Sequence, residues 1–413
     1  MSDDMRDDMH DDMRYDMRYD VFSPEAIADP YPAYRRLQAE SPRFWNAERG
    51  IWVFTRHADV AALLAHPSLS AQKFDAQGLT PELRVEFGPL YEMLSRQMLF
   101  RDPPHQTRLR TLAAKAFTPR VIERLRVQIQ RWTEKFLDDA LANGPLDIIR
   151  DLAYPLPATV IAEMLGIPHE DRDRFRHWSD DFADFLGTDG DDWERTRPFL
   201  PGIYHLMDYL HGAVERTRTT PGDNLLSALI AAEEQGDRLT EEELIANCLL
   251  LLVAGHETTT NLIGNGLYAL LSHPDQAALL REDPALLPTA IEEMLRYESP
   301  VQWTSRIPKE TITLDGLRIE AGQFAMLGLG ASNRDPAQFT DPDRLDITRR
   351  EGRHLAFGWG VHYCLGAALA RMEGQIALGT LLRRFPALRL AAGEPLRWRQ
   401  NFIFRALEAL PVE

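Results

Sequence analysis

Residues 357–366 read FGWGVHYCLG, from Phe357 to Gly366, and this stretch decides the fold because it presents a single cysteine, Cys364, in a glycine-rich turn. The chain has only 2 cysteines, so Cys364 belongs neither to a disulfide framework nor to a four-cysteine zinc site. The glycines let the backbone turn tightly and let a flat cofactor lie close to it. An apolar pattern with helical spacing begins at Leu365, which predicts that Cys364 lies at the start of a helix.

A cysteine at a helix start is surrounded by chemistry that favours its ionised form. The free N–H groups and the positive end of the helix dipole stabilise a thiolate. A thiolate held in this way suits a heme iron, to which it donates electron density that favours O–O cleavage. The alternative is a buried free cysteine that begins an ordinary helix.

A second informative stretch lies in the middle of a long predicted helix. Thr240 and Glu243 form the pattern of a capping box, and the apolar run behind it continues to Ser272. About 33 residues at 1.5 Å each give a helix of roughly 50 Å. Midway, residues 254–260 read AGHETTT, a poor composition for the interior of a buried helix. Threonine hydroxyls there can bond back to carbonyl groups one turn earlier, and such local disruption often marks a functional site. The alternative is a polar notch or a satisfied buried network.

Taken together, three motifs resemble those of the cytochrome P450 superfamily. The cysteine stretch matches F-x-x-G-x-x-x-C-x-G, and residues 254–258 match A/G-G-x-D/E-T. Glu293 and Arg296 match E-x-x-R between them, in the same order and at similar spacing. The resemblance covers residues 21–413 and implies a mainly α fold with small β-sheets. It implies one large heme-binding domain in which the long central helix crosses the heme.

The resemblance also implies roles for individual residues. Cys364 would be the axial ligand of the heme iron, and Glu257 and Thr258 would relay protons during oxygen activation, with Thr259 a weaker candidate. Glu293 and Arg296 would form a structural pair that a later arginine, Arg344, completes. His256 holds the variable position of its motif and is expected to make a packing or hydrogen-bonding contact. Cys248 is expected in the core.

The cofactor implied is heme b (iron protoporphyrin IX), whose two propionates need fixed cations or donors. The family places these at positions that correspond here to Gln106, Arg110, Arg306 and His362. Gln106 stands where the family often has histidine, and it can donate the same bond without adding charge. The other cofactor-binding positions carried over are Ala254, Phe357, Gly358 and Gly366.

Composition excludes several functional classes. The formal net charge of −17 argues against nucleic acid as a partner. No apolar stretch approaches the roughly 18 residues or more of a membrane span. The N-terminus is acidic and lacks the apolar region of a signal peptide, and the low cysteine count favours a cytoplasmic protein. Residues 1–20 repeat Asp-Asp-Met-Arg/His units and predict a disordered acidic tail rather than a helix with a methionine stripe.

Other segments give coarser predictions. Residues 44–54 predict a β-hairpin, and residues 67–100 read as an irregular loop over a pocket. Further strands are expected at 312–314, 324–327 and 402–404. Residues 67–100, 180–205, 301–304 and 401–403 are expected to line a pocket for a small apolar organic substrate.

The predicted activity is insertion of one oxygen atom from O₂ into that substrate. No flavin, iron–sulfur or nicotinamide motif is present, so an external ferredoxin and ferredoxin reductase are expected to supply electrons. Arg110 is expected to bind a propionate, so four arginines remain as candidates for its docking face: Arg101, Arg108, Arg353 and Arg371. A peroxide-driven oxygenase and a non-catalytic heme-binding sensor are the alternatives.

Overall fold

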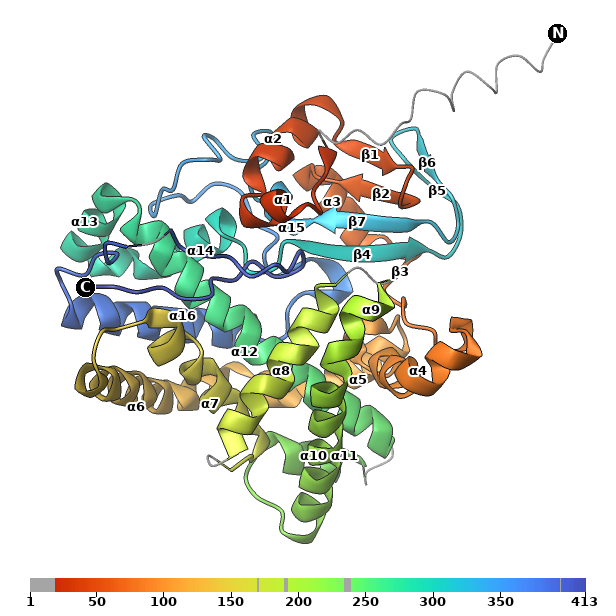
Figure 1. Ribbon diagram of the computed structural model, residues 1–413, viewed down its shortest axis with the longest axis horizontal. Helices are drawn as coiled ribbons and strands as arrows, with labels where there is room; N and C mark the ends of the chain where they lie inside the picture. Colours follow the sequence, from red (N-terminus) through yellow and green to blue (C-terminus); the bar gives the residue numbers. More distant parts are fainter. Residues whose placement is uncertain (1–18, 169–170, 189–191, 234–238, 394) are drawn as a thin grey trace.

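The computed structural model describes residues 19–413 except 169–170, 189–191, 234–238 and 394. Most of the predicted tail therefore lies outside the described residues. Helices form the larger part of the molecule, and a mixed sheet lies at one end, beside the N-terminal helices (Figure 1). The prediction of a mainly α domain with small β-sheets is confirmed. Among the described residues, no helix combines the length and the apolar character that crossing a membrane requires.

The helices have the following bounds: α1 Pro24–Ala28, α2 Tyr31–Glu40, α3 His57–Ala65, α4 Pro81–Ser95, α5 His105–Ala114, α6 Pro119–Asn143, α7 Pro155–Leu165, α8 Arg172–Leu186, α9 Trp193–Thr196, α10 Leu200–Thr219, α11 Leu225–Glu233, α12 Glu241–Leu271, α13 Pro274–Glu282, α14 Leu287–Tyr297, α15 Leu329–Ser332 and α16 Ala367–Arg384.

Two sheets accompany the helices. The larger sheet has the strand order β1-β2-β7-β4-β3, with β2 and β7 parallel and the other neighbours antiparallel. Its strands are β1 Arg43–Asn46, β2 Ile51–Phe54, β3 Leu69–Ser70, β4 Trp303–Pro308 and β7 Phe324–Gly328. The smaller sheet pairs β5 Ile312–Leu314 with β6 Leu317–Ile319. The hairpin predicted at residues 44–54 is the β1–β2 pair.

The predicted capping box opens α12. Thr240 accepts a hydrogen bond from the N–H of Glu243, and the Glu243 carboxylate accepts one from the N–H of Thr240. The helix runs for 31 residues and is buried along most of its length, because α7, α14 and α16 pack around it. Gly374 of α16 marks one close approach, since a Cβ there would lie 3.2 Å from Leu262 of α12.

Two predictions about local structure are wrong. Residues 67–100 are not one irregular loop, because Pro81–Ser95 form α4, with Thr80 as N-cap and Pro81 in the first turn. The helix was not predicted because it contains an internal proline, Pro89, which argues against a helix on local grounds. Residues 402–404 are not a strand, since only Phe404 forms an isolated bridge, to Val301. Strand β4, Trp303–Pro308, was not predicted, because Arg306 and Pro308 interrupt the apolar pattern expected of a strand.

Candidate active site

The cysteine turn is fixed by its own backbone. The N–H of Cys364 donates to the carbonyl of Phe357 at 2.9 Å, which closes the loop. Gly358 and Gly360 have φ values of +67° and +71°, a left-handed conformation that glycine adopts without strain. Gly360 also lies against α3, where a Cβ would come within 2.9 Å of the carbonyl oxygen of Leu64. These contacts hold Cys364 three residues before the first residue of α16.

Burial and hydrogen bonding act in opposite directions on the Cys364 thiol. Burial raises its pKa, whereas the N–H groups of Gly366 and Ala367, together with the positive charges of Arg110 and Arg371, act to lower it. The predicted helix-start donors are therefore present, but they do not overcome desolvation by themselves. A bound metal cation deprotonates a coordinating thiol outright, so this donor arrangement fits a cysteine that ligates iron.

The other cysteine behaves differently. Cys248 is 1% exposed in the apolar core, and burial raises its pKa to about 12. Among the described residues, burial alone accounts for this rise. The prediction that Cys248 is a core residue is confirmed.

The middle of α12 has one face that is not covered by protein. Ala254 is exposed and Gly255 and Thr258 are half-buried, although their helical neighbours Val253 and Glu257 are buried. The Thr258 hydroxyl donates to the carbonyl of Ala254 at 2.8 Å, the one-turn back-bond that the sequence predicts. A flat group can lie against this face, because alanine presents only a methyl group there.

The remaining residues of this motif have protein partners. Thr259 donates to the carbonyl of Gly255 at 3.1 Å. The Nδ1–H of His256 donates to the carbonyl of Leu252 at 2.9 Å, which confirms the expected hydrogen-bonding role. Glu257 accepts from Asn261 at 3.2 Å and from Arg399 at 3.4 Å. Sequence reasoning missed Arg399, since no motif includes it.

Positive side chains gather near the cysteine turn. Arg306 of β4 is 7% exposed, and burial lowers its pKa to about 10. Burial and the charges of Arg306 and Arg110 lower the pKa of His362 to about 4, against the opposing charge of Asp102. Lys73 is exposed as a residue, but desolvation of its ammonium group and the charge of Arg306 lower its pKa to about 8. Such shifts mark cations that lack a sufficient counter-charge.

The chemistry of these groups fits a ligand with two carboxylates. Arg306 donates to the carbonyl of Ser305 at 2.7 Å, and the ammonium of Lys73 lies 3.4 Å from the Ser305 hydroxyl. Within the described part of the chain, neither cation has a carboxylate inside ion-pair distance. A role for Lys73 was not predicted. The only feature of the sequence that could have indicated it is that this basic residue lies in residues 67–100, which were expected to line the pocket.

Gln106 and Arg110 of α5 approach the same turn. The Gln106 amide is buried and donates to the carbonyl of Val361 at 2.9 Å, which leaves one N–H for the predicted propionate contact. Arg110 is half-buried, and its charge acts on both His362 and Cys364. Phe357 packs under the guanidinium of Arg371 at 4.5 Å.

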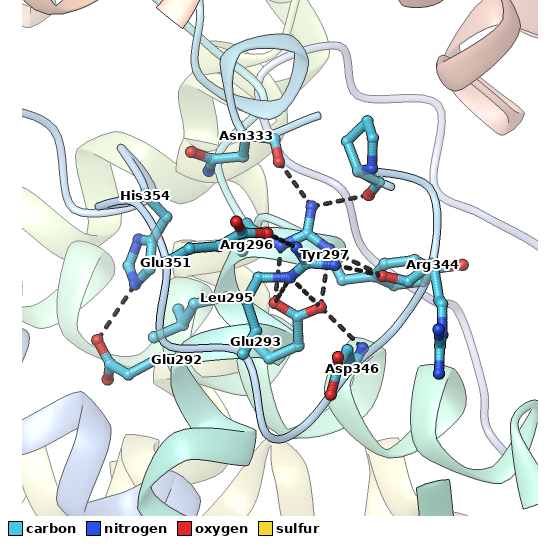
Figure 2. Close-up of polar contacts among 12 residues, drawn as sticks. Glu292, Glu293, Leu295, Arg296, Tyr297, Asn333, Arg344, Asp346, Glu351 and His354 are labelled. Carbon is cyan, nitrogen blue, oxygen red and sulfur yellow. Dashed lines mark hydrogen bonds and ion pairs between the residues drawn. The ribbon is translucent and has the colours of Figure 1, made fainter. Parts of the chain in front are cut away.

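The E-x-x-R pair forms as expected. Arg296 and Glu293 make two hydrogen bonds, of 2.7 and 2.8 Å, and both side chains are almost fully buried. The prediction that Arg344 completes the Glu293–Arg296 pair is wrong. Arg344 contributes only its carbonyl oxygen, which accepts from Arg296 at 3.1 Å, whereas the guanidinium that reaches Glu293 belongs to Arg349, at 3.2 Å. Figure 2 shows Glu293, Arg296 and the backbone of Arg344 in this network.

Comparisons with known proteins agree with this geometry. A model of the family "Cytochrome P450" matches residues 51–396. Cytochrome P450 107B1 of Saccharopolyspora erythraea is 45% identical over 394 residues, which is 93% of this chain and 95% of that protein. The vitamin D(3) 25-hydroxylase of Pseudonocardia autotrophica is 43% identical, with 95% of each chain covered.

A solved structure shows the same architecture. P450BioI in complex with a hexadec-9Z-enoic acid ligated acyl carrier protein superposes with a TM-score of 0.86 at 39% identity, covering 94% of this chain and 99% of that chain. The family match spans most of the chain, and the thiol donor, the open face of α12 and the cationic cluster fit a heme. The chain therefore belongs to the cytochrome P450 family and is a monooxygenase.

Proposed function

We propose that this chain binds heme b through Cys364 and inserts one atom of O₂ into a small apolar organic substrate. The observation that carries the proposal is the Cys364 turn, which the N–H of Cys364 closes onto the carbonyl of Phe357 at 2.9 Å and which places the thiol three residues before α16. When bound, the heme supplies the oxygen-activating chemistry, and a thiolate ligand favours O–O cleavage. The domain responsible comprises residues 21–413, preceded by the acidic tail of residues 1–20, and the enzyme acts in the cytoplasm.

The cationic cluster would hold the two heme propionates. Arg306 and Lys73 lie side by side and share Ser305 as a neighbour, so one carboxylate between them would supply the missing counter-charge. His362 and Arg110 would serve the second carboxylate, assisted by the free N–H of Gln106. Ala254, Phe357, Gly358 and Gly366 would contact the ring, because each presents little bulk or a flat surface.

Glu257 and Thr258 would deliver protons. The Thr258 hydroxyl is accessible on the open face of α12. Its hydrogen can turn from the Ala254 carbonyl to a ligand while its oxygen accepts a hydrogen bond from a water molecule. The Glu257 carboxylate belongs to the preceding residue and is 4% exposed. Only a few water molecules can therefore reach it to exchange protons. Positioned proton transfer of this kind is typically worth about 10² to 10⁴ in rate.

The substrate class is proposed from the relatives. One is named for hydroxylation of vitamin D(3), and one solved structure holds a hexadecenoic acyl chain. Both ligands are long and apolar. A screen of sterols and fatty acids for shifts of the heme absorption band tests this assignment, and a panel without any shift would contradict it.

Electrons would come from an external ferredoxin and its reductase. An open pocket of about 460 Å³ lies between α14, α16 and the loop before Cys364, and its lining includes Arg350, Arg353 and Arg371. Basic side chains beside the cysteine turn suit an acidic partner, since complementary charges steer encounter.

The proposed ligand has a direct test. The ferrous carbon monoxide complex of the wild type should absorb at the long wavelength specific to thiolate ligation, and Cys364→His should lose that band. The matched control is Cys248→Ala, which removes the only other thiol and should leave the band in place. Retention of the band in Cys364→His would refute the assignment.

A further inference from the structure

Arg399 lies in the C-terminal segment, far from the motifs, yet it touches the acid of the central helix. Its backbone is fixed, because its N–H donates to the carbonyl of Ala406 at 2.9 Å and the neighbouring Trp398 bridges to Leu407. The side chain extends from this paired segment toward α8 and α12. Its position is therefore set by the fold rather than by a mobile chain end.

One guanidinium joins the two helices. Nη1 of Arg399 lies 3.4 Å from Oε1 of Glu257 on α12, and Nη2 donates to Oδ1 of Asp184 on α8 at 2.6 Å. Nη1 also lies 3.7 Å from Oδ1 of Asp180, one turn earlier on α8. Close by, the Asn401 amide donates to the carbonyl of Ala183 at 2.9 Å, which holds the C-terminal segment against α8.

The same oxygen of Glu257 accepts from Asn261, at 3.2 Å. Two donors, one on α12 and one in the C-terminal segment, therefore hold this carboxylate oxygen. Without a cation, a buried carboxylate is strongly penalised. The Asp184 contact is short and charge-assisted, the strong type of hydrogen bond. Asp184 therefore anchors Arg399, and Arg399 in turn sets the direction of Glu257.

Exposure decreases along this cluster. The side chains of Asp184 and Asp180 are 36% and 34% exposed, Arg399 is 23% exposed, and Glu257 is 4% exposed. Burial raises the pKa of Asp180, Arg399 opposes this rise, and the charge of Glu257 adds to it. Asp180, Asp184 and Glu257 therefore share the guanidinium of Arg399, and the two aspartates on α8 form the end of the cluster that solvent reaches.

We propose that Arg399 is a positioning residue that orients Glu257 for proton transfer. Through Asp184, Arg399 also makes this orientation depend on the position of α8 against the C-terminal segment. The inference rests on the proposed function, because it presumes that Glu257 delivers protons. Displacement of α8 would remove Asp184 from Arg399 and would free Glu257 to turn. Other charged or titratable groups close to the cluster are Arg176, His177, Asp181, His256 and Tyr154.

The test needs no known substrate. The heme-loaded full-length enzyme is supplied with NADPH, a plant-type ferredoxin and ferredoxin reductase, and the NADPH oxidised per O₂ consumed is measured. Reduction of O₂ to hydrogen peroxide takes two electrons and two protons, and reduction to water takes four of each. Poor proton delivery favours peroxide, so the ratio should fall toward about one in Arg399→Gln and Asp184→Asn. Arg399→Lys should retain part of the wild-type ratio.

A pH series separates positioning from a merely structural role. In Arg399→Gln the peroxide fraction should rise with pH between about 6 and 9, because protons would then come from bulk solvent. A loss that is equal at every pH would indicate structural damage and would overturn the inference. The thiolate-specific carbon monoxide band and unchanged binding of imidazole verify that each variant is folded.

Thr258→Ala is measured in the same assay. If Thr258→Ala lowers the ratio and Arg399→Gln does not, the role of Arg399 is refuted while the proposed function stands. If Thr258→Ala leaves the ratio unchanged, the proton relay itself is wrong, and the inference falls with it. Arg318→Gln is the control for loss of an arginine charge, because Arg318 pairs with Glu320 at the surface of the small sheet.

Discussion

The guanidinium of Arg349 lies 3.2 Å from the carboxylate of Glu293, which is 56 residues earlier in the chain. Glu293 thereby receives donors from two arginines, and it also accepts from the N–H of Asp346 at 2.9 Å. A buried carboxylate is tolerated only with such compensation. The network ties α14 to the loop that precedes the cysteine turn (Figure 2).

The first prediction compares the two candidate arginines. Arg349→Ala should lower the free energy of unfolding by about 1–3 kcal/mol, because it removes a charged donor from a buried acceptor. Arg344→Ala should change it by less than about 0.5 kcal/mol, since only its backbone carbonyl takes part. Urea denaturation followed by circular dichroism, at matched heme content, checks both. Equal losses in the two variants would contradict the assignment.

This pair also shows what the sequence can predict. Spacing along one helix identifies the Glu293–Arg296 contact, because residues three apart share a face. The partner from a distant loop depends on how residues 341–351 turn, and three arginines in that loop, Arg344, Arg349 and Arg350, fit the pattern equally well.

The same limit applies to the site. Local patterns predicted the cysteine turn, the capping box and the back-bond of Thr258. Lys73 and Arg399 were missed because their roles come from tertiary proximity, to Arg306 and to Glu257 respectively. The helix α4 was missed because its internal proline argues against a helix on local grounds.

The second prediction concerns Lys73. Lys73→Met should speed the transfer of heme to apomyoglobin by about tenfold or more, since a charge-assisted hydrogen bond is worth about 1.5–3 kcal/mol. Lys73→Arg should keep most of the wild-type retention. The control is Lys309→Met, which removes an exposed lysine 4.0 Å from Asp102 and should leave heme transfer unchanged. Transfer at the wild-type rate in Lys73→Met would exclude a propionate contact.

The third prediction refines the docking face. The side chains of Arg108 and Arg371 are only 27% and 29% exposed and are ion-paired with Glu243 and Glu292, so a charge reversal at either would bring two carboxylates together at a partly buried site. Arg353 is exposed and lies over the ring of Trp359 at 4.4 Å, and among the described residues it has no carboxylate within ion-pair distance. Arg353→Glu should therefore slow reduction by a ferredoxin and weaken its dependence on salt.

Stopped-flow reduction at several ionic strengths measures both effects. The matched control is Arg318→Glu, a charge reversal at the surface of the small sheet, which should leave the rate unchanged. A rate that responds neither to salt nor to Arg353→Glu would place the docking face elsewhere.

The fourth prediction follows from the ion pairs of Glu292. Burial by itself would raise the pKa of this carboxyl, but hydrogen bonds from Arg371 and His354 hold it at about 2. A carboxyl whose pKa is lower in the folded state stabilises the fold above its unfolded value of about 4.5, and this stabilisation is lost as pH falls toward about 2. Glu292→Gln should therefore lower the thermal midpoint at pH 7, and the difference from wild type should shrink as pH falls from about 4.5 to 3. The control Glu48→Gln removes an exposed carboxylate in the turn between β1 and β2 and should show little difference at any pH. A gap between wild type and Glu292→Gln that stays constant down to pH 3 would show that the lowered pKa does not contribute to stability.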